Sequence, residues 1–408
     1  MVPKGWTLGT LKDLADTIMG YAFRSEDFVP TGIPLLRMGN LYQNTLDLNR
    51  NPVYLPDSFK VDYKRFLVSP GDLVMSMTGT MGKRDYGFTV EIPSNTQCSL
   101  LNQRVLKIVP KNNASSGYIL NLLRSELILS VLYSFPGGTK QANLSAKQLQ
   151  ELPVLIPPEL EQKKIAQILS TWDKAITVTE KLLVNSQQQK KALMQQLLTG
   201  KKRLLDENGV SFSGAWKWLR AAELFKTISQ KNNSEDEELL AVTQDLGVIL
   251  RSMLERRVVM PDGSTKGYKL VVPGNFIISL RSFQGGLEYS RYRGLVSPAY
   301  TVLTPIKKIV DEFYKQYYKS YDFIGHLAVA VIGIRDGKQI SYEDFSFLKL
   351  PYPEIEEQQK IAAVLSAADA EISTLEKKLA CRRDEKKALM QQLLTGKRRV
   401  KVDEAVAV

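Results

Sequence analysis

The 408 residues contain only two cysteines and one histidine, which excludes most metal and thiol chemistry. Cys98 and Cys381 form no Cys-x-x-Cys pair, so we expect neither a disulfide framework nor a structural zinc site, which needs three or four ligands. With His326 as the lone imidazole, no serine–histidine or cysteine–histidine relay can exist elsewhere. His326 begins an apolar run that predicts a buried strand, with the histidine as a core or edge residue.

The chain also lacks a long apolar run. No segment approaches the ~20 residues of a membrane-spanning helix, and the N-terminus has no apolar signal region, so a cytoplasmic location is expected. Hydrophobic residues make up 44% and charged residues 24%, as in globular proteins, and the length predicts two or three domains. The net charge of +12 favours a polyanionic partner such as nucleic acid.

One segment is duplicated at an offset of 196 residues. Residues 190–201 recur without change at 386–397, and 27 of the 53 aligned positions of 152–204 and 348–400 are identical. Each copy predicts one helix of about 40 residues, roughly 60 Å long at 1.5 Å per residue. Prolines precede each copy, and Gly200 or Gly396 ends it.

Apolar residues in each predicted helix are spaced alternately by four and three positions, which is typical of a coiled-coil seam. Matched seams in one chain predict an antiparallel pair with an approximate twofold relation. Both seams turn polar at the same level, at Ser186 and Lys190 and at Arg382 and Lys386. This level is either a solvated stretch of the helix pair or a docking level for a partner. The predicted seam and subunit-interface residues are Ile165, Leu169, Trp172, Ile176, Leu193, Leu197, Ile361, Leu365, Ile372, Leu389 and Leu393.

Two blocks of different sequence share the same landmarks around these helices. Each opens with a tryptophan-containing stretch and contains a Pro-Gly turn followed by an apolar strand, at 70–76 and 273–279. Short β-branched runs, many turns and helices near 118–132 and 307–321 predict α+β domains. The expected fold is α+β, with two α/β domains separated by two long antiparallel helices that form an intramolecular coiled coil. The predicted parts are a first domain at 1–156, a central helical spacer at 157–205, a second domain at 206–352 and a C-terminal spacer and tail at 353–408.

Contacts with DNA must come from local basic faces, because residues 206–347 carry 18 Lys and Arg against 17 Asp and Glu. Gly-rich basic loops that interleave cations, aromatics and amides are the candidates, since Arg grips guanine and Asn or Gln grips adenine in the major groove. At each position the alternative is an ordinary solvated loop. The predicted DNA contacts are Lys83, Arg84, Arg104, Lys140 and Gln141 in the first domain, and Arg281, Gln284, Arg291, Tyr292 and Arg293 in the second.

Two motifs with catalytic associations fail on inspection. The run 51–54, Asn-Pro-Val-Tyr, is similar to the Asn-Pro-Pro-Tyr motif of adenine methyltransferases but lacks the second proline and a glycine-rich cofactor loop before it. The run 79–83 is similar to a phosphate-binding loop, but Met77 and Arg84 occupy positions that need Gly and Ser or Thr. No catalytic residues are therefore predicted.

The arrangement resembles the specificity subunits of type I restriction–modification systems over nearly the full length. The duplicated Glu-Gln-x-Lys-Ile-Ala-x-x-Leu-Ser helix start, the Leu-Met-Gln-Gln-Leu-Leu-Thr-Gly-Lys helix end and the Pro-Gly-(Asp/Asn) strand signature carry the resemblance. It implies that each target-recognition domain reads one half of a bipartite, asymmetric DNA site, while the helices set the gap and bind two methyltransferase subunits.

The same resemblance assigns the cofactors to partners. S-adenosylmethionine would be bound by the methyltransferase, which flips and methylates an adenine, and ATP and Mg²⁺ by a motor-nuclease subunit. This chain would be a non-catalytic subunit without a cofactor or metal of its own. The second domain has nearly as many acidic as basic residues. How much of the DNA-binding affinity comes from this domain and how much from the methyltransferase is therefore left open.

Two other functions compete with this interpretation. A coiled-coil adaptor that binds only proteins would show no salt-dependent affinity for DNA. A self-sufficient restriction–modification enzyme is disfavoured because methyltransferase motifs are absent and the length leaves no room for them.

Overall fold

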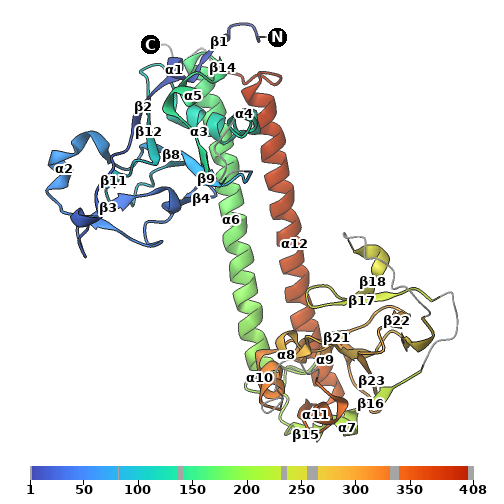
Figure 1. Cartoon of the computed structure of the whole chain (residues 1–408). Helices are drawn as coiled ribbons and strands as arrows, with labels where there is room; N and C mark the ends of the chain where they lie inside the picture. Colours follow the sequence, from blue (N-terminus) through green and yellow to red (C-terminus); the bar gives the residue numbers. More distant parts are fainter. Residues whose placement is uncertain are drawn as a thin grey trace. The chain divides into compact units, whose positions relative to one another are not determined.

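The chain folds into two compact units, each built from one domain and parts of both long helices. The computed structural model describes residues 2–80, 82–135, 141–230, 237–254, 265–330 and 340–402. Unit 1 comprises Met1–Glu180 and Lys378–Val408, and unit 2 comprises Lys181–Lys377. The helices α6 (Glu159–Leu197) and α12 (Ile355–Leu394) each run from one unit into the other, as Figure 1 shows. Within the described ranges, no helix is long and apolar enough to span a membrane.

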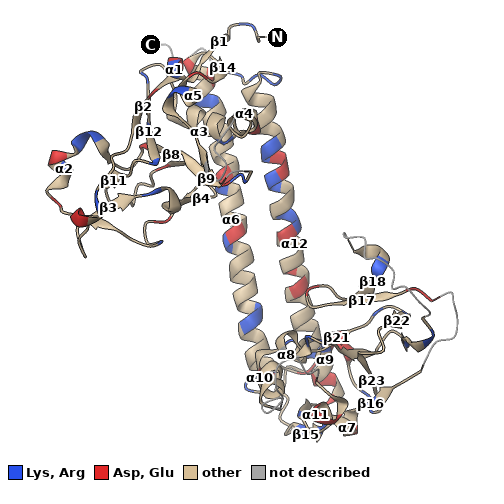
Figure 2. Cartoon of the chain, viewed as in Figure 1, with Lys and Arg blue, Asp and Glu red and all other residues tan. Residues whose placement is uncertain are grey.

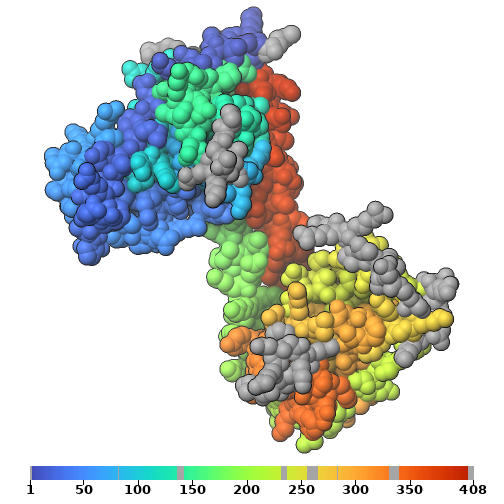
Figure 3. Space-filling view, viewed as in Figure 1, coloured from blue at the N-terminus to red at the C-terminus, as the bar shows by residue number. Residues whose placement is uncertain are grey.

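Unit 1 is an α+β domain packed on the start of α6 and the end of α12. Its central antiparallel sheet has the order β10-β8-β12-β2, and a second sheet, β6-β3-β11-β7, belongs to a distal lobe. This lobe lies on the side of the domain away from α6 and forms a protrusion in the space-filling view (Figures 1 and 3). The elements are β1 (Thr7–Thr10), α1 (Leu11–Leu14), β2 (Ala15–Met19), β3 (Ile33–Leu36), β4 (Leu41–Tyr42), β5 (Thr45–Leu46), β6 (Tyr54–Leu55), α2 (Phe59–Asp62), β7 (Leu67–Val68), β8 (Leu73–Ser76), β9 (Thr78–Thr80), β10 (Thr89–Glu91), β11 (Ser99–Leu101), β12 (Val105–Pro110), α3 (Ser116–Arg124), α4 (Glu126–Leu132), β13 (Gln141–Asn143), α5 (Ala146–Gln150) and β14 (Pro153–Ile156).

Unit 2 repeats this plan, with a tight turn between β17 and β18 where unit 1 has a long connection between β3 and β6. Its main antiparallel sheet has the order β16-β23-β20-β21, which matches β2-β12-β8-β10 strand for strand. In each unit the first strand of the domain pairs antiparallel with the strand that precedes a long helix. The elements are β15 (Lys217–Arg220), α7 (Ala221–Leu224), β16 (Phe225–Ile228), β17 (Leu240–Thr243), β18 (Gly247–Leu250), β19 (Lys269–Val271), β20 (Phe276–Ile278), α8 (Ser282–Gly285), β21 (Glu288–Tyr289), β22 (Gly294–Val296), β23 (Thr301–Pro305), α9 (Asp311–Tyr317), α10 (Tyr321–Ala330), α11 (Tyr342–Ser346) and β24 (Lys349–Tyr352).

The outer seam residues of the long helices belong to the domain cores. Ile165, Leu169 and Leu393 are buried in the core of unit 1, and Leu197, Ile361 and Leu365 in the core of unit 2. The remaining predicted seam residues (Trp172, Ile176, Leu193, Ile372 and Leu389) are half-buried. The seam was predicted from pairing between the helices alone, whereas its ends also pack against sheets and short helices. Apolar spacing reports burial but does not distinguish between a helix and a domain as the covering surface.

The start of each long helix is held by the same three-residue arrangement, which we call the clamp. In unit 2, Arg203 Nε and Nη2 donate to the two carboxylate oxygens of Glu357 at 2.6 and 2.7 Å, and Trp216 Nε1 donates at 2.9 Å. In unit 1, Glu161 accepts the equivalent bonds from Arg399 (2.5 and 3.0 Å) and Trp6 (3.1 Å). Each guanidinium also lies over its tryptophan ring, 5.8 or 5.6 Å from the centroid.

The residues after the clamp fix each helix to its domain in the same way. Gln162 accepts from Ser115 N and donates to Pro157 O, while Gln358 accepts from Val310 N and donates to Pro353 O. These bonds join the first turn of the long helix to the start of α3 or α9 and to the preceding strand. The buried glutamine therefore satisfies backbone groups that packing would otherwise leave unpaired.

The two predicted C-terminal glycines have the left-handed conformation that ends a helix. Gly200 has φ +71° and Gly396 has φ +66°. A Cβ at Gly200 would lie 3.3 Å from the Trp216 ring, and one at Gly396 only 2.3 Å from Pro3. Both glycines are therefore required by backbone conformation and by the close approach of the domain.

The polar level of the seam holds ion pairs between the helices. Lys190 contacts Asp369 at 2.5 Å in unit 2, and Lys386 contacts Asp173 at 2.6 Å in unit 1. Both lysines are largely shielded, with 19% and 15% of their side chains exposed. Figure 2 shows the charged residues along both helices. Of the two alternatives for this level, the contacts favour a property of the helix pair itself, with ion pairs in place of the expected solvation.

Two local predictions are wrong. His326 lies at an exposed position of α10 and contacts Asp322 at 3.7 Å, because the described part of the apolar run, residues 326–330, is helical and does not form the expected buried strand. The helix expected near 118–132 is divided at Ser125 into α3 and α4, and the helix expected near 307–321 is limited to the shorter α9. Short apolar runs do not distinguish strand from helix when tertiary packing determines the outcome.

We predict that Arg203→Met lowers the free energy of unfolding by about 3–5 kcal/mol, because it leaves the Glu357 carboxylate, 1% exposed, without its cation. Denaturant unfolding followed by tryptophan fluorescence measures the change. Lys202→Met removes the same charge one residue away, from an exposed position, and is the matched control. Equal stability of the two variants would contradict the importance of the clamp.

Candidate DNA-reading clefts

Each unit has a cleft beside the connection between two equivalent strands. In unit 1 this connection joins the antiparallel strands β3 and β6 and contains the β4–β5 hairpin. In unit 2 it joins the antiparallel strands β17 and β18 and is only a tight turn, 244–246. The sheet is similar in both units, so the clefts differ mainly in what this connection supplies.

The cleft of unit 1 has a volume of about 610 Å³ and is rich in arginine and amide side chains. Arg50, Gln103 and Arg104 are exposed, and Arg37 is half-buried. Tyr42 is 51% exposed and lies under the Arg50 guanidinium, 5.1 Å from the ring centroid. Arginine with asparagine or glutamine is the set that reads base edges, and an exposed tyrosine adds a planar apolar contact. The lining residues are Arg37, Met38, Gly39, Asn40, Leu41, Tyr42, Arg50, Asn51, Asp85, Phe88, Asn102, Gln103 and Arg104.

Two asparagines, the buried Asn40 and the half-buried Asn44, give the loop of this cleft its shape. The Asn40 side chain is 3% exposed and donates to the carbonyls of Asp47 (2.9 Å) and Arg50 (3.0 Å), which closes the loop. Asn44 adopts φ +60°, and its side chain accepts from Thr89 N at 2.9 Å. Arg124 donates to the carbonyls of Asn44 and Thr89. These contacts order the loop before any ligand binds, which lowers the entropic cost of binding.

The charge of the unit 1 cleft is strongly positive. Three arginines line it with one acid, Asp85, whose carboxylate already accepts from Thr80 N at 2.7 Å. Arg37 donates to the carbonyl of Asn51, a neutral group, so its charge is not compensated by that contact. An electropositive concave surface of this kind attracts the phosphates of a duplex and places its donors at the groove.

The cleft of unit 2 has a volume of about 550 Å³, and its cations are paired within the protein. Arg291 contacts Glu312, which also contacts Lys315 at 3.0 Å. The hydrogen bond from Arg291 to Glu312 raises the pKa of this guanidinium. Tyr292 is half-buried at the same cleft.

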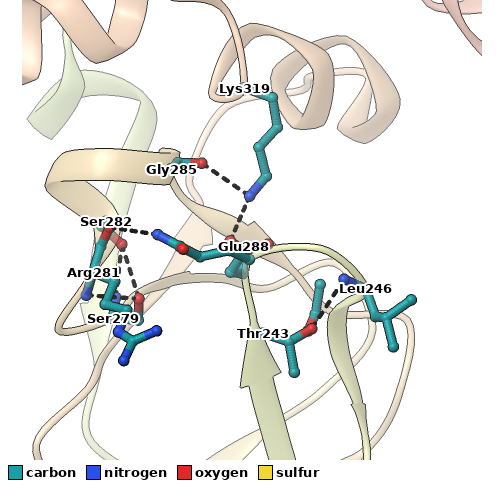
Figure 4. A network of polar contacts seen from close by, with 10 residues as sticks. Thr243, Leu246, Ser279, Arg281, Ser282, Gly285, Glu288 and Lys319 are labelled. Carbon is teal, nitrogen blue, oxygen red and sulfur yellow. Dashed lines mark hydrogen bonds and ion pairs between the residues drawn. The ribbon is translucent and has the colours of Figure 1, made fainter. Parts of the chain in front are cut away.

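In the lining of this cleft, one buried acid anchors the segment that carries α8. Glu288 is 2% exposed and contacts Lys319, which also donates to Gly285 O at 3.0 Å (Figure 4). Burial raises the pKa of Glu288, and the contact with Lys319 opposes this shift. Gly286, at φ +76°, lies so near Tyr318 that a Cβ would meet its carbonyl oxygen at 1.7 Å. These contacts therefore fix the segment that presents Arg281 and Gln284.

The ten predicted contacts occupy different kinds of position. Arg104 lines the first cleft, and Arg291 and Tyr292 line the second. Lys83 and Arg281 are exposed on loops and Gln284 is exposed in α8, while Arg84 pairs with Glu126 at 3.1 Å and Arg293 with Glu237 at 2.7 Å. Lys140 lies outside the described residues, and Gln141 is described only as the first residue of β13. Contact with DNA stays a prediction for all ten.

Sequence reasoning missed the loop that builds most of the first cleft. Arg37, Tyr42 and Arg50 lie between short strands, without the Gly-rich basic pattern that marked the other candidates. Asn51 was considered only within a possible methyltransferase motif, whereas the structure places it at the cleft with φ +50°. An available signal was the run of turn-forming Asn and Gly residues around an arginine and a tyrosine.

The described residues contain no group of three or more His, Cys, Asp or Glu side chains that could hold a metal ion. Both clefts are lined by cationic and amide side chains, which can contact base edges and phosphates. The two free cysteines, Cys98 and Cys381, lie apart from both cleft linings.

Comparison with known proteins agrees with the repeated plan. The family model of the type I restriction modification DNA specificity domain matches residues 3–185 and 216–380. A protein of Methanocaldococcus jannaschii, described as a type I restriction enzyme MjaX specificity subunit, is 26% identical over 421 residues, covering 98% of this chain and 95% of that protein. The type I restriction enzyme EcoAI specificity subunit of Escherichia coli is 27% identical over 183 residues, covering 44% of this chain and 30% of that protein.

Solved structures share the fold at low sequence identity. A type I restriction-modification system S subunit from M. genitalium matches with a TM-score of 0.58 at 14% identity, covering 95% of this chain and 96% of that chain. These findings confirm the family resemblance and the predicted α+β fold with its two long helices.

For the first cleft we predict that Arg104→Ala weakens binding to the recognised duplex by about 1–3 kcal/mol and relaxes sequence preference at one position, as loss of a base contact does. Fluorescence anisotropy over a panel of singly substituted duplexes measures both effects. Arg65→Ala removes the same charge from an exposed site outside the cleft lining and is the control. Unchanged affinity and preference for Arg104→Ala would show that the cleft does not read bases.

Proposed function

Because the chain belongs to the DNA specificity subunits of type I restriction–modification systems, a non-catalytic class, we propose that its two clefts read the two halves of one asymmetric, gapped DNA site. This proposal rests on one observation: the two domains are attached to the long helices by the same clamp, but their clefts have different lining residues. The clamps at Glu161 and Glu357 attach both domains to the helices in the same way. The two clefts differ in the charge and size of their lining residues and in the length of the loop beside them.

Different lining residues imply different half-sites. The first cleft presents three arginines with amides and a tyrosine, so it favours a half-site with guanine and adenine edges in the major groove. The second cleft presents Arg291 and Tyr292 beside a short turn at Gln244. Because Arg291 is paired with Glu312, it must leave this carboxylate to contact the ligand, or contact both at once. The two domains then cannot exchange half-sites, and the recognised sequence is not palindromic.

The second domain contributes less electrostatic affinity than the first in this proposal. Arg291, Arg293 and Lys319 are paired with Glu312, Glu237 and Glu288, so binding there releases fewer counterions from DNA. A partner that also grips the duplex compensates for this difference. The helices serve as the spacer, because a 39-residue helix is about 58 Å long and stiff.

We assign the chemistry of the complex to partner subunits. Two methyltransferase subunits bind S-adenosylmethionine and methylate adenine, and motor-nuclease subunits bind ATP and Mg²⁺, while this chain binds none of these cofactors. The assembly operates in the cytoplasm. Two findings support this assignment: the chain belongs to this family, and no catalytic motif was found in its sequence.

Base-resolution methylation mapping tests the recognition function. A host expressing this chain with its methyltransferase should carry methyladenine at one gapped, asymmetric motif. Exchange of residues 206–347 for the corresponding domain of a relative should change one half of the motif and leave the other half and the clamp region intact. The unexchanged chain is the control.

Two outcomes contradict the proposal. Methylation with no motif, from an assembled complex, favours the protein-binding adaptor. A change of both half-sites after the exchange refutes the assignment of one half-site to each domain.

A further inference from the structure

The turn between β17 and β18 presents three exposed side chains to the second cleft. Gln244, Asp245 and Leu246 are all exposed, and all three belong to the cleft lining. Leu246 is 67% exposed, although leucine is a large apolar residue. A single exposed leucine is ordinary on a protein surface. This leucine, however, directly follows an acid in the lining of a cleft, so the turn combines apolar and acidic groups at one point.

Hydrogen bonds hold the backbone of this turn in one shape. Thr243 Oγ1 accepts from Leu246 N at 3.0 Å (Figure 4) and donates to the carbonyl of Gly247 at 3.0 Å. Gly247 has φ +72°, which suits glycine at the end of a short hairpin loop. Gln244 Nε2 donates to Arg281 O at 3.2 Å and joins the turn to the segment that carries α8. The turn is therefore ordered before a ligand binds, which lowers the entropic cost of binding.

The cations that line this cleft all have carboxylate partners within the protein. The pairs are Lys190 with Asp369, Lys319 with Glu288, and both Arg291 and Lys315 with Glu312. Asp245 has no ion-pair partner among the described residues. The charge without a direct partner in the second cleft is therefore negative, whereas the first cleft presents arginines. A carboxylate accepts hydrogen bonds and donates none, so the two clefts favour different base edges.

The four bases differ in how their major-groove edges meet a carboxylate and an apolar side chain. Cytosine presents an amino donor beside a C–H group, whereas adenine presents its amino donor beside the N7 acceptor, which repels a carboxylate. Guanine presents two acceptors and thymine one, and both repel a carboxylate. Thymine also carries a 5-methyl group, which apolar side chains contact. Asp245 therefore fits cytosine, and Leu246 fits thymine.

We propose that the second domain reads the amino group of a cytosine with Asp245 and the 5-methyl group of a neighbouring thymine with Leu246. This inference rests on the proposed function, which supplies DNA as the ligand, and it adds the base chemistry of the second half-site. Consecutive Cα atoms are about 3.8 Å apart and consecutive base pairs about 3.4 Å, so adjacent residues of the turn reach adjacent base pairs. The carboxylate also rejects a wrong base, because guanine at the same position places two acceptors against it.

The contact with the methyl group is tested by replacing each thymine of the second half-site with uracil, which removes only that group. Fluorescence anisotropy of the chain assembled with its methyltransferase measures binding to each duplex. One replacement should weaken binding about threefold to fivefold, as the loss of one buried methyl group does. Leu246→Ala should abolish this difference between thymine and uracil. Ile306→Ala truncates an apolar residue of unit 2 that is 48% exposed and outside the cleft lining, and it should retain the difference.

The contact with cytosine is tested by Asp245→Asn and by duplexes that carry guanine in place of each cytosine of the second half-site. At one position the substitution should lower the preference for cytosine over guanine about tenfold, because a neutral amide accepts more weakly and no longer repels guanine. An acid that only faced phosphates would leave this ratio unchanged, and its removal would raise both affinities. Glu343→Gln removes the charge of an exposed acid outside the cleft lining and should leave the ratio unchanged.

Three results would overturn the inference: an unchanged cytosine preference in Asp245→Asn, an undiminished uracil effect in Leu246→Ala, or a second half-site made only of A·T or only of G·C pairs. The preferences at the first half-site should be the same in every variant, because the first cleft is unaltered. With these preferences intact, failure of the inference leaves the proposed function standing. An unmodified complex without any sequence preference refutes the proposed function and the inference together.

Discussion

Each unit depends on one buried carboxylate at the start of a long helix. Glu161 and Glu357 are each held by an arginine from beyond the end of the other long helix and by the tryptophan that immediately precedes the first strand of the domain. Three chain segments that are far apart in sequence therefore meet at one charged group. Removing any partner leaves a buried charge or an unpaired indole donor, so the three segments are held together or not at all.

The contacts between the helices follow the same principle of compensated charge. Half-shielded ion pairs join Lys190 to Asp369 and Lys386 to Asp173. An apolar seam at this level would select the register of the two helices less strictly. An apolar seam tolerates shifts of register, whereas an ion pair loses its partner when one helix slides by a turn. In unit 1, Arg382 adds a bond to the carbonyl of Ala175 at 2.9 Å, where the equivalent Ser186 of unit 2 instead contacts Glu371 at 3.3 Å. The polar level therefore defines the pairing of the helices.

On this common support, loop length determines what each cleft presents. The connection from β3 to β6 is long enough to fold a hairpin, to bury Asn40 and to project Arg50 over Tyr42. The connection from β17 to β18 is a tight turn, so the second cleft takes its cations from α6, from α9 and from the segments that follow β21 and α9, where acids already neutralise them. The same sheet thus supports an electropositive cleft in one unit and an internally balanced one in the other.

The sequence by itself determined the duplication, the two long helices, their glycine ends and the α+β class, because these depend on local periodicity and on exact repetition over many residues. It also indicated Arg104, Arg291 and Tyr292, which follow recognisable basic and aromatic patterns. Only the tertiary structure decided that seam leucines enter the domain cores, that the run at His326 is helical, and that Arg37, Tyr42 and Arg50 share a cleft. These outcomes depend on contacts between segments far apart in the chain, and such contacts leave no periodic trace in the order of residues.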